Sequence, residues 1–222
     1  MLLFKGKDVD IMNIYKNIDE LVGKTPLMEI SNIIKEENLQ ASIFAKLECF
    51  NPTGSAKDRP ALQMILKAEE DGVLKENSVI IEPTSGNTGI GIAAIAASRG
   101  FDVILTMPDT MSVERIKLLK AYGAKLILTE GSKGMKGAIE KALELANEDK
   151  NVFIPQQFEN DANVKAHYEL TGPEIFKDTN GEVDIFVSAV GSGGTVSGAG
   201  KYLKEKKASV KVVAVEAAAS PV

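Results

Sequence analysis

The chain has 222 residues, of which 44% are hydrophobic and 26% charged, a size that suits one large or two small compact domains. Its 26 basic and 31 acidic residues give a formal net charge of −5, which disfavours a dedicated nucleic-acid binder, and no apolar run approaches the ~20 residues needed to span a membrane. A single cysteine and a single histidine exclude an internal disulfide and a zinc site with two histidines, so we expect no metal and favour a reducing cytoplasm.

Short β-branched runs alternate with amphipathic segments along the chain. Strands are predicted over residues 42–48, 78–82, 102–107, 125–129, 152–154, 183–190 and 210–216. Helices are predicted over residues 60–72, 90–98, 113–122, 134–147 and 196–203. The capping-box spacing of Thr171 and Glu174 predicts that a further helix begins there, and Ser112 and Gly123 are expected to bound the helix over 113–122. This alternation predicts an α/β fold with mainly parallel sheets, whose most apolar strands are covered by helices on both faces.

The apolar run over residues 210–216 is an exception, because only six residues follow it. A parallel strand is normally covered by a crossover helix, and the sequence AAASPV cannot supply one. We therefore expect the fold to be interrupted here, unless another chain shields this strand.

Two glycine-rich loops follow predicted strands and lead into apolar helices. The first reads EPTSGNTGI over residues 82–90, and the second reads VGSGGT over residues 190–195. Free N–H groups at a helix N-terminus bind anions, and glycine allows the backbone to approach them closely. The second loop has neither the lysine of a nucleotide-binding P-loop nor the glycine spacing of a dinucleotide-binding motif. These loops are therefore either anion sites or plain strand-to-helix turns.

A third loop, NPTGSAKDR over residues 51–59, leads into the helix predicted from Pro60. It places Lys57 at a helix start, where the helix dipole disfavours a positive charge. The neutral amine is the form that condenses with an aldehyde, although most lysines are simply solvated charges. An amine, a phosphate-sized cradle and a carboxylate-sized cradle are together the parts needed to hold pyridoxal phosphate beside an amino acid.

The chain closely resembles the cysteine synthase (O-acetylserine sulfhydrylase) family of fold-type-II pyridoxal-phosphate enzymes, from about Ile18 to its last residue. The resemblance is carried by NPTGSAKDR, EPTSGNTG, TMPDTMSVERIKLLKAYGA, PQQFENDAN and GSGGT, in this order. It implies two three-layer α/β/α domains with mainly parallel sheets, a small domain over residues 51–159 and a larger cofactor-binding domain over residues 1–50 and 160–222. Family members continue well past position 222, so we expect the larger domain to be incomplete.

The resemblance also implies roles for individual residues. Lys57 would be the catalytic Schiff-base lysine and would remove the α-proton of the substrate. The pyridoxal phosphate would be bound by Lys57, Asn87, Gly191, Ser192, Gly193, Gly194 and Thr195. The substrate carboxylate would be bound by Thr84, Ser85, Gly86, Thr88 and Gln157. His167 matches a non-catalytic position, so we expect a structural or surface role for it.

The implied reaction is a β-replacement in which O-acetyl-L-serine loses acetate and gains sulfide to give L-cysteine. The family also implies a homodimer, and its members can bind the C-terminal tail of serine acetyltransferase in the active-site cleft. Three alternatives stay open: a non-catalytic fragment or binding module of the same family, a cystathionine β-synthase, and an amino-acid dehydratase. The segment over residues 106–124 favours the sulfhydrylase branch.

Overall fold

The structure is a computed structural model, and it describes residues 14–219. Its helices are α1 (Ser31–Glu36), α2 (Asp58–Glu70), α3 (Asn87–Arg99), α4 (Val113–Ala121), α5 (Gly134–Glu148), α6 (Asp161–Ala166), α7 (Gly172–Asp178) and α8 (Gly194–Lys206). Its strands are β1 (Leu27–Glu29), β2 (Phe44–Lys46), β3 (Val79–Pro83), β4 (Asp102–Pro108), β5 (Lys125–Thr129), β6 (Val152–Phe153), β7 (Ile185–Ala189) and β8 (Lys211–Val215). The α/β class and the parallel pairing predicted from the sequence are confirmed.

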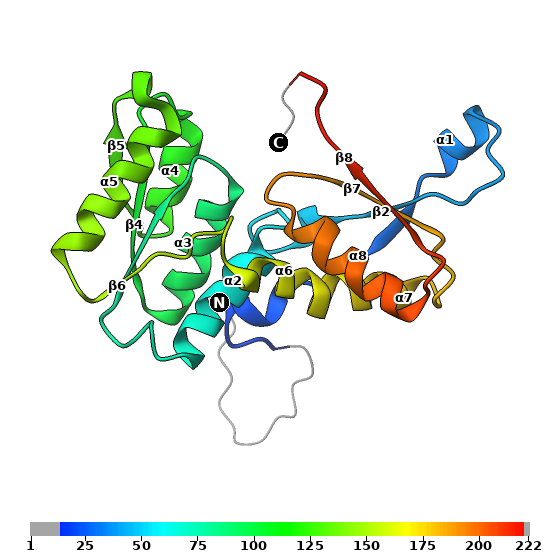
Figure 1. Ribbon diagram of the computed structural model, residues 1–222, viewed down its shortest axis with the longest axis horizontal. Coiled ribbons are helices and arrows are strands. Elements are labelled where there is room, and N and C mark those ends of the chain that lie inside the picture. The colour runs from blue at the N-terminus through cyan, green and yellow to red at the C-terminus, as the bar shows by residue number, and fades with distance from the viewer. Residues whose placement is uncertain (1–13, 220–222) are drawn as a thin grey trace.

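A four-stranded parallel sheet in the order β5-β4-β3-β6 occupies one end of the molecule (Figure 1). Val79 of β3 pairs with Asp102 of β4 on one side and with Val152 of β6 on the other. Helix α5 returns the chain across one face of this sheet, while α3 and α4 lie on the opposite face. Ile80 and Leu105 are fully buried between these layers because their strands are apolar on both faces.

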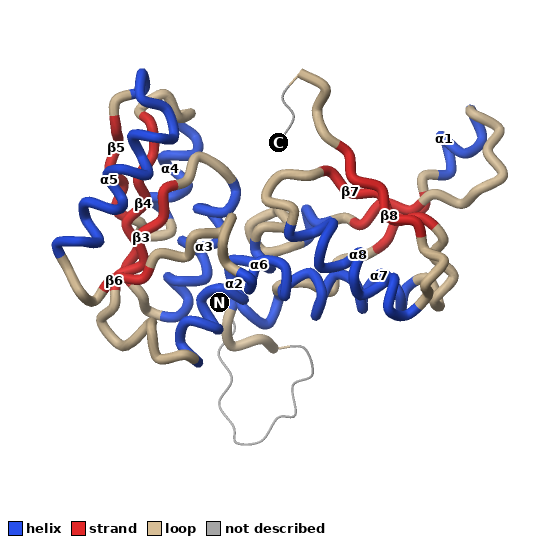
Figure 2. Tube along the Cα trace, in the orientation of Figure 1, coloured by secondary structure: helices blue, strands red, loops and turns tan. Residues whose placement is uncertain are grey.

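The other end of the molecule contains α6, α7 and α8 with two small sheets (Figure 2). Strands β1 and β2 pair antiparallel, whereas β7 and β8 pair parallel. One side of the β7–β8 pair is open to solvent, since Ile185 and Val187 of β7 are 56% and 59% exposed and Val213 and Val215 of β8 are 41% and 46% exposed. The strand predicted to lack a cover is thus uncovered on this side.

Helix α7 begins at Gly172, directly after Thr171, with Pro173 in its first turn as predicted, but Thr171 does not cap a free helix end, because the chain is already helical from Asp161. Asn160 caps α6, its side chain accepting a hydrogen bond from the Ala162 N–H at 3.0 Å. Thr171 already has helical dihedral angles and makes no capping bond, because it ends a widened π-helical turn over His167–Thr171 that joins α6 to α7. The wide turn lies just before Pro173, which cannot donate a backbone hydrogen bond to the preceding turn.

The bounds of α4 follow the sequence signals. The Ser112 side chain accepts from the Arg115 N–H at 3.4 Å, and Gly123, two residues past the helix end, has a left-handed φ of +86°. In the described part of the chain, 14–219, no helix is both long enough and apolar enough to cross a membrane.

Candidate functional site

Lys57 lies immediately before α2, between the two ends of the molecule. A Cβ added to Gly91 of α3 would lie only 3.1 Å from the Lys57 carbonyl oxygen, so the two helices meet closely here. The Lys57 side chain is half-buried, and its Nζ lies 3.4 Å from the Ser192 Oγ. Burial lowers the pKa of the Lys57 amine, which favours its neutral form. The structure therefore joins the predicted nucleophile to a loop 135 positions later in the sequence.

The loop over residues 191–195 connects β7 to α8. Gly193 has a left-handed φ of +79°, a conformation that glycine adopts without a steric penalty. The turn brings the loop onto the N-terminus of a 13-residue helix, whose first N–H groups have no partner within the helix. A Cβ at Gly191 would meet no atom within 4 Å, so the backbone is open there. This is the geometry of an anion site, and it lies beside the Lys57 amine.

The loop over residues 84–88 connects β3 to α3. Thr84 and Thr88 are each 3% exposed, and the Thr88 hydroxyl donates to the Gln157 Oε1 at 2.6 Å. The Arg115 guanidinium donates to the Ser85 carbonyl, which fixes this loop from α4. The structure thus brings Thr88 and Gln157 together from positions 69 apart.

Two predicted site residues of this loop lie in open surroundings. Asn87 is exposed at the first position of α3, and Gly86 has open space around it. Within the described residues, no hydrogen bond joins the Asn87 side chain to another predicted site residue.

Glu82 is a buried acid directly before the 84–88 loop. It is 2% exposed, and its carboxylate accepts from the Gln156 N–H at 3.2 Å. Gln156 has a positive φ of +50°, an uncommon backbone conformation for a residue other than glycine. Burial raises the Glu82 pKa to about 7, even though hydrogen bonds from the backbone of Gln156 and Gln157 lower it. Glu82 therefore holds the segment that carries Gln157.

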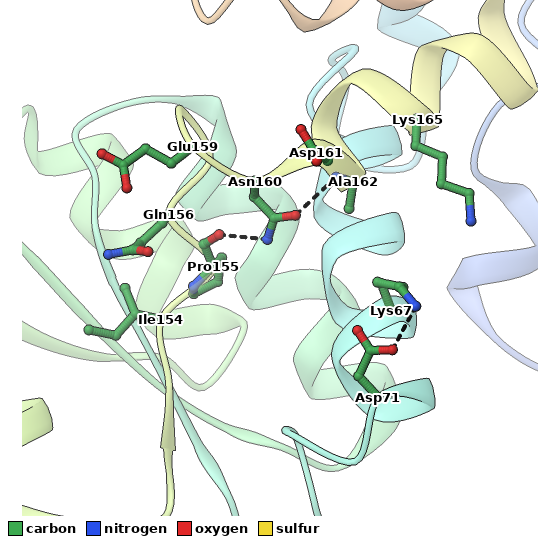
Figure 3. Close-up of a pocket in the computed structure, with 10 residues that line it drawn as sticks. All are labelled: Lys67, Asp71, Ile154, Pro155, Gln156, Glu159, Asn160, Asp161, Ala162 and Lys165. Atoms are coloured by element: carbon green, nitrogen blue, oxygen red, sulfur yellow. Dashed lines mark hydrogen bonds and ion pairs between the residues drawn. The ribbon is translucent and has the colours of Figure 1, made fainter.

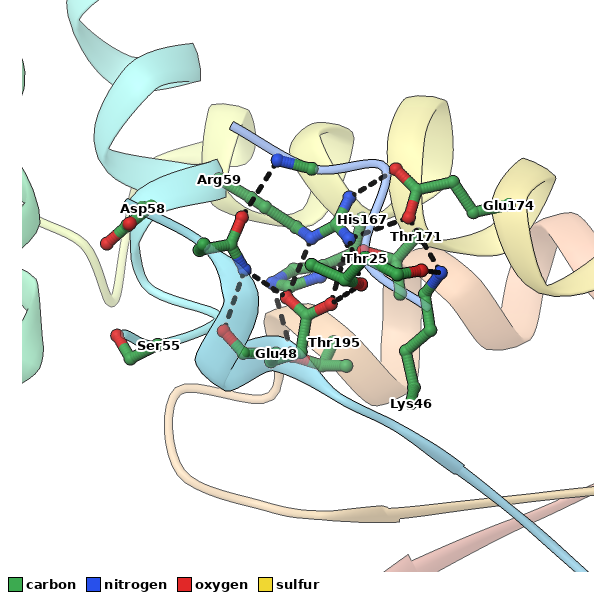
Figure 4. Close-up of polar contacts among 12 residues, drawn as sticks. Thr25, Lys46, Glu48, Ser55, Asp58, Arg59, His167, Thr171, Glu174 and Thr195 are labelled. Carbon is green, nitrogen blue, oxygen red and sulfur yellow. Dashed lines mark hydrogen bonds and ion pairs between the residues drawn. The ribbon is translucent and has the colours of Figure 1, made fainter. Parts of the chain in front are cut away.

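His167 was expected to have a structural or surface role, and the structure places it inside. It is 1% exposed, its Nδ1 lies 2.9 Å from the Thr171 Oγ1, and its Nε2 lies 3.1 Å from the Thr195 Oγ1 (Figure 4). Burial, together with the positive charge of Arg59, lowers its pKa to about 4, so the ring is neutral at pH 7. His167 thus contacts Thr195, one of the residues predicted to bind the cofactor phosphate, and the sequence contained no signal for this contact.

A buried ionic network lies beside His167 (Figure 4). Arg59 is 0% exposed, and its Nε donates to the Glu48 Oε2 and its Nη1 to the Glu174 Oε1, both at 2.7 Å. Lys46 adds a second positive charge 2.8 Å from the Glu174 Oε2. Hydrogen bonds from Arg59 and Lys46 outweigh the effect of burial and lower the Glu174 pKa to about 2. The network fixes the segment that carries Lys57 against α7.

A surface hollow of about 420 Å³ lies elsewhere, between the end of α2 and residues 154–165 (Figure 3). Its lining mixes acids and lysines, and Asn160 uses its side chain there to donate to the Pro155 carbonyl at 2.8 Å. None of the predicted site residues lines it. Over residues 14–219, no cluster of three histidine, cysteine or acidic side chains could hold a metal ion.

Comparison with known proteins shows the family to which the chain belongs. Residues 18–222 match the family model described as "Pyridoxal-phosphate dependent enzyme". A cysteine synthase from Staphylococcus aureus is 51% identical over 207 residues, which is 93% of this chain and 66% of that protein. The chain therefore spans about two thirds of the length of this relative.

Solved structures show the same likeness. A hydrogen sulfide-producing enzyme from Fusobacterium nucleatum has a TM-score of 0.89 and 48% identity, covering 94% of this chain and 68% of that one. A cysteine synthase from Entamoeba histolytica also has a TM-score of 0.89, with 46% identity over 96% of this chain and 64% of that one.

Proposed function

Because this chain belongs to the family of pyridoxal-phosphate-dependent enzymes, we propose that it supplies the cofactor-binding amine of a cysteine synthase. The reaction would convert O-acetyl-L-serine and sulfide to L-cysteine and acetate. The cysteine synthase relatives, at about half sequence identity, support this choice among the reactions that the family performs.

The observation that carries the proposal is the 3.4 Å distance between the Lys57 Nζ and the Ser192 Oγ. Pyridoxal phosphate bears an aldehyde and a phosphate on one small ring, so its protein partners must be an amine and an anion site close together. Lys57 and the 191–195 loop meet this requirement. The open backbone at Gly191 and the free N–H groups of α8 leave room for a phosphate.

When bound, the cofactor would supply an electron sink for the negative charge that forms at the substrate α-carbon. Lys57 would hold the cofactor and then accept the α-proton on its Nζ. Its lowered pKa supports this use, because an amine must be neutral to take up a proton.

The substrate carboxylate would bind at the N-terminus of α3, to Thr84, Ser85, Gly86 and Thr88, with Gln157 facing them. The hydrogen bond from Thr88 to Gln157 supports this assignment, because it brings side chains from two separate segments together. We place Asn87 against the cofactor ring, where its exposed position at the start of α3 leaves its amide free to bind.

Further parts of the proposal concern the whole protein. We propose a small domain over residues 51–159 and a larger one over residues 1–50 and 160–222, a homodimer, and a cytoplasmic location. We also propose that the cleft accepts the C-terminal tail of serine acetyltransferase, since a helix N-terminus that binds a substrate carboxylate would also bind a terminal carboxylate.

Covalent trapping tests the proposal. The chain is incubated with pyridoxal phosphate, reduced with borohydride and digested, and the label is expected on the peptide that contains Lys57. Lys57→Ala should abolish the label, whereas Lys67→Ala, a matched change of an exposed lysine on α2, should leave it. An unlabelled Lys57 peptide in the wild-type protein would refute the proposal. A labelled protein that forms no cysteine from O-acetyl-L-serine and sulfide would instead favour the non-catalytic module.

A further inference from the structure

We propose that Asn163 is a positioning residue that couples two parts of the site. One is the amino-acid site, formed by residues 84–88 and Gln157, and the other is the phosphate loop, formed by residues 191–195. The inference deepens the proposed function and rests on it, since it assigns a role between two of the segments that would bind cofactor and substrate. Asn163 is the third residue of α6 and is 3% exposed.

One amide group joins the two segments. The Asn163 Nδ2 donates to the Gln157 carbonyl at 2.8 Å and to the Ser192 Oγ at 2.9 Å. On one side, Gln157 accepts the hydrogen bond from Thr88 through its side chain. On the other side, Ser192 lies next to the Lys57 amine. The planar amide of Asn163 therefore connects the amino-acid site, through Gln157, to the neighbour of the Lys57 amine, Ser192.

The sequence leaves space for this amide only because residue 194 is glycine. A Cβ on Gly194 would lie 2.3 Å from the Asn163 Oδ1 and 2.7 Å from its Cγ, well inside contact distance. The amide thus packs directly on the backbone of the phosphate loop, at the first residue of α8. Close packing of this kind passes small displacements from one segment to the next.

The orientation of the amide is fixed by its partners. A flipped amide would place its oxygen against the Gln157 carbonyl oxygen and would lose that hydrogen bond, because a carbonyl can only accept. In the orientation observed, Oδ1 is buried beside Gly194 and has no hydrogen-bond partner among the described residues. An unpaired buried acceptor is unfavourable, and the two hydrogen bonds that the Nδ2 donates offset this cost.

The expected consequence is that both segments lose order together when Asn163 is changed. Asn163→Ala removes the two hydrogen bonds, and a hydrogen bond of this kind corresponds to about a threefold to tenfold change in a local equilibrium. Hydrogen–deuterium exchange without any ligand should become at least threefold faster in both the 156–160 and the 191–195 segments. The dissociation constant for pyridoxal phosphate should rise by a similar factor.

Two further variants separate this role from a general loss of structure. Asn163→Asp keeps the volume of the side chain but removes its donors, so exchange in 156–160 should again be fast. Asn160→Ala removes the cap of the same helix without touching Ser192, so it should leave exchange in 191–195 and cofactor affinity unchanged.

The proposal fails if Asn163→Ala leaves either segment at the wild-type exchange rate, or if Asn163→Asp behaves as the wild type in 156–160. It also fails if Asn160→Ala disturbs 191–195 as strongly as Asn163→Ala does. Because the exchange measurement needs no cofactor, its result is independent of whether Lys57 becomes labelled. Failure of the proposed function and failure of the coupling are therefore observed separately.

Discussion

The Arg59 Nη1 and the Glu174 Oε1 lie 2.7 Å apart, and this contact joins the residue two places after Lys57 to a helix 115 positions later. The Arg59 Nη2 also donates to the Glu174 Oε2 at 2.7 Å, so the pair has the bidentate geometry that guanidinium and carboxylate groups favour. Since the Arg59 side chain is fully buried, its charge depends on its carboxylate partners for compensation.

We expect Glu174→Gln to lower the free energy of unfolding by about 3 kcal/mol, because it removes one of two carboxylates from a buried guanidinium. Urea denaturation followed by circular dichroism measures this change. Glu144→Gln, which removes an exposed partner of Lys141, is the matched control and should leave the midpoint nearly unchanged. Equal midpoints for the two variants would contradict the importance of the buried pair.

Glu174 also predicts a sensitivity to acid. Its pKa falls from 4.5 in the unfolded chain to about 2 in the folded protein. The unfolded chain therefore takes up a proton first, and stability that is present above pH 4.5 is lost as the pH falls toward 2. The slope of unfolding free energy against pH in this range should be smaller for Glu174→Gln than for the wild-type protein.

Glu82 should have the opposite effect at higher pH. Its pKa rises from 4.5 to about 7 on folding, so the folded protein keeps a proton that the unfolded chain releases. The contribution of Glu82 to stability should therefore decrease between pH 4.5 and 7, by about 3 kcal/mol at most. Glu82→Gln should remove this decrease and gain stability relative to the wild type as the pH rises. A constant difference between the two proteins across this range would show that folding does not raise the Glu82 pKa.

His167 should oppose Glu82 over much of the same range. Its pKa falls from 6.5 to about 4 on folding, so the unfolded chain binds the proton first and stability is lost as the pH falls from 6.5 to 4. The two effects largely cancel between pH 4.5 and 6.5 in the wild-type protein. We expect His167→Gln to reveal the Glu82 slope, with stability falling as the pH rises, in thermal melts at half-unit pH intervals. An unchanged profile would contradict the burial of a neutral ring.

The glycines of the phosphate loop give a matched pair of substitutions. Gly194→Ala forces a Cβ into the Asn163 amide, whereas Gly191→Ala adds a Cβ where no atom lies within 4 Å. We expect Gly194→Ala to cost about 1–3 kcal/mol of stability and to weaken pyridoxal phosphate binding, because overpacking displaces the loop. Gly191→Ala should leave stability nearly unchanged. The measurements are a denaturation curve and an absorbance titration with the cofactor.

The strands of the four-stranded sheet were predictable from the sequence because their apolar runs are short and separated by turn residues. The run over 125–129 became β5 with the same bounds, and the run over 102–107 became β4 one residue longer. The start of the α6–α7 helix was not predictable in this way. Thr171 and Glu174 have the spacing of a capping box, but in the folded chain the Thr171 hydroxyl contacts His167 and the Glu174 carboxylate binds Arg59.

The site was predictable as three loops, but not as a connected set of contacts. Lys57 and the glycine loop each have a local sequence signature, and their proximity depends on the tertiary fold. Asn163 and His167 have no local signature, because an isolated amide or imidazole inside a helix is usually a packing residue. Their contacts with Ser192 and Thr195 span 29 and 28 positions, beyond the reach of helix or strand periodicity.

The 135 positions between Lys57 and Ser192 also affect the timing of synthesis. At about 5–20 residues per second, a ribosome needs on the order of 10 seconds to make the intervening chain. During this interval the amine has been synthesised while its anion-binding partner does not yet exist. An aldehyde cofactor can therefore be captured with both of its groups held only after the nascent polypeptide has grown past Thr195.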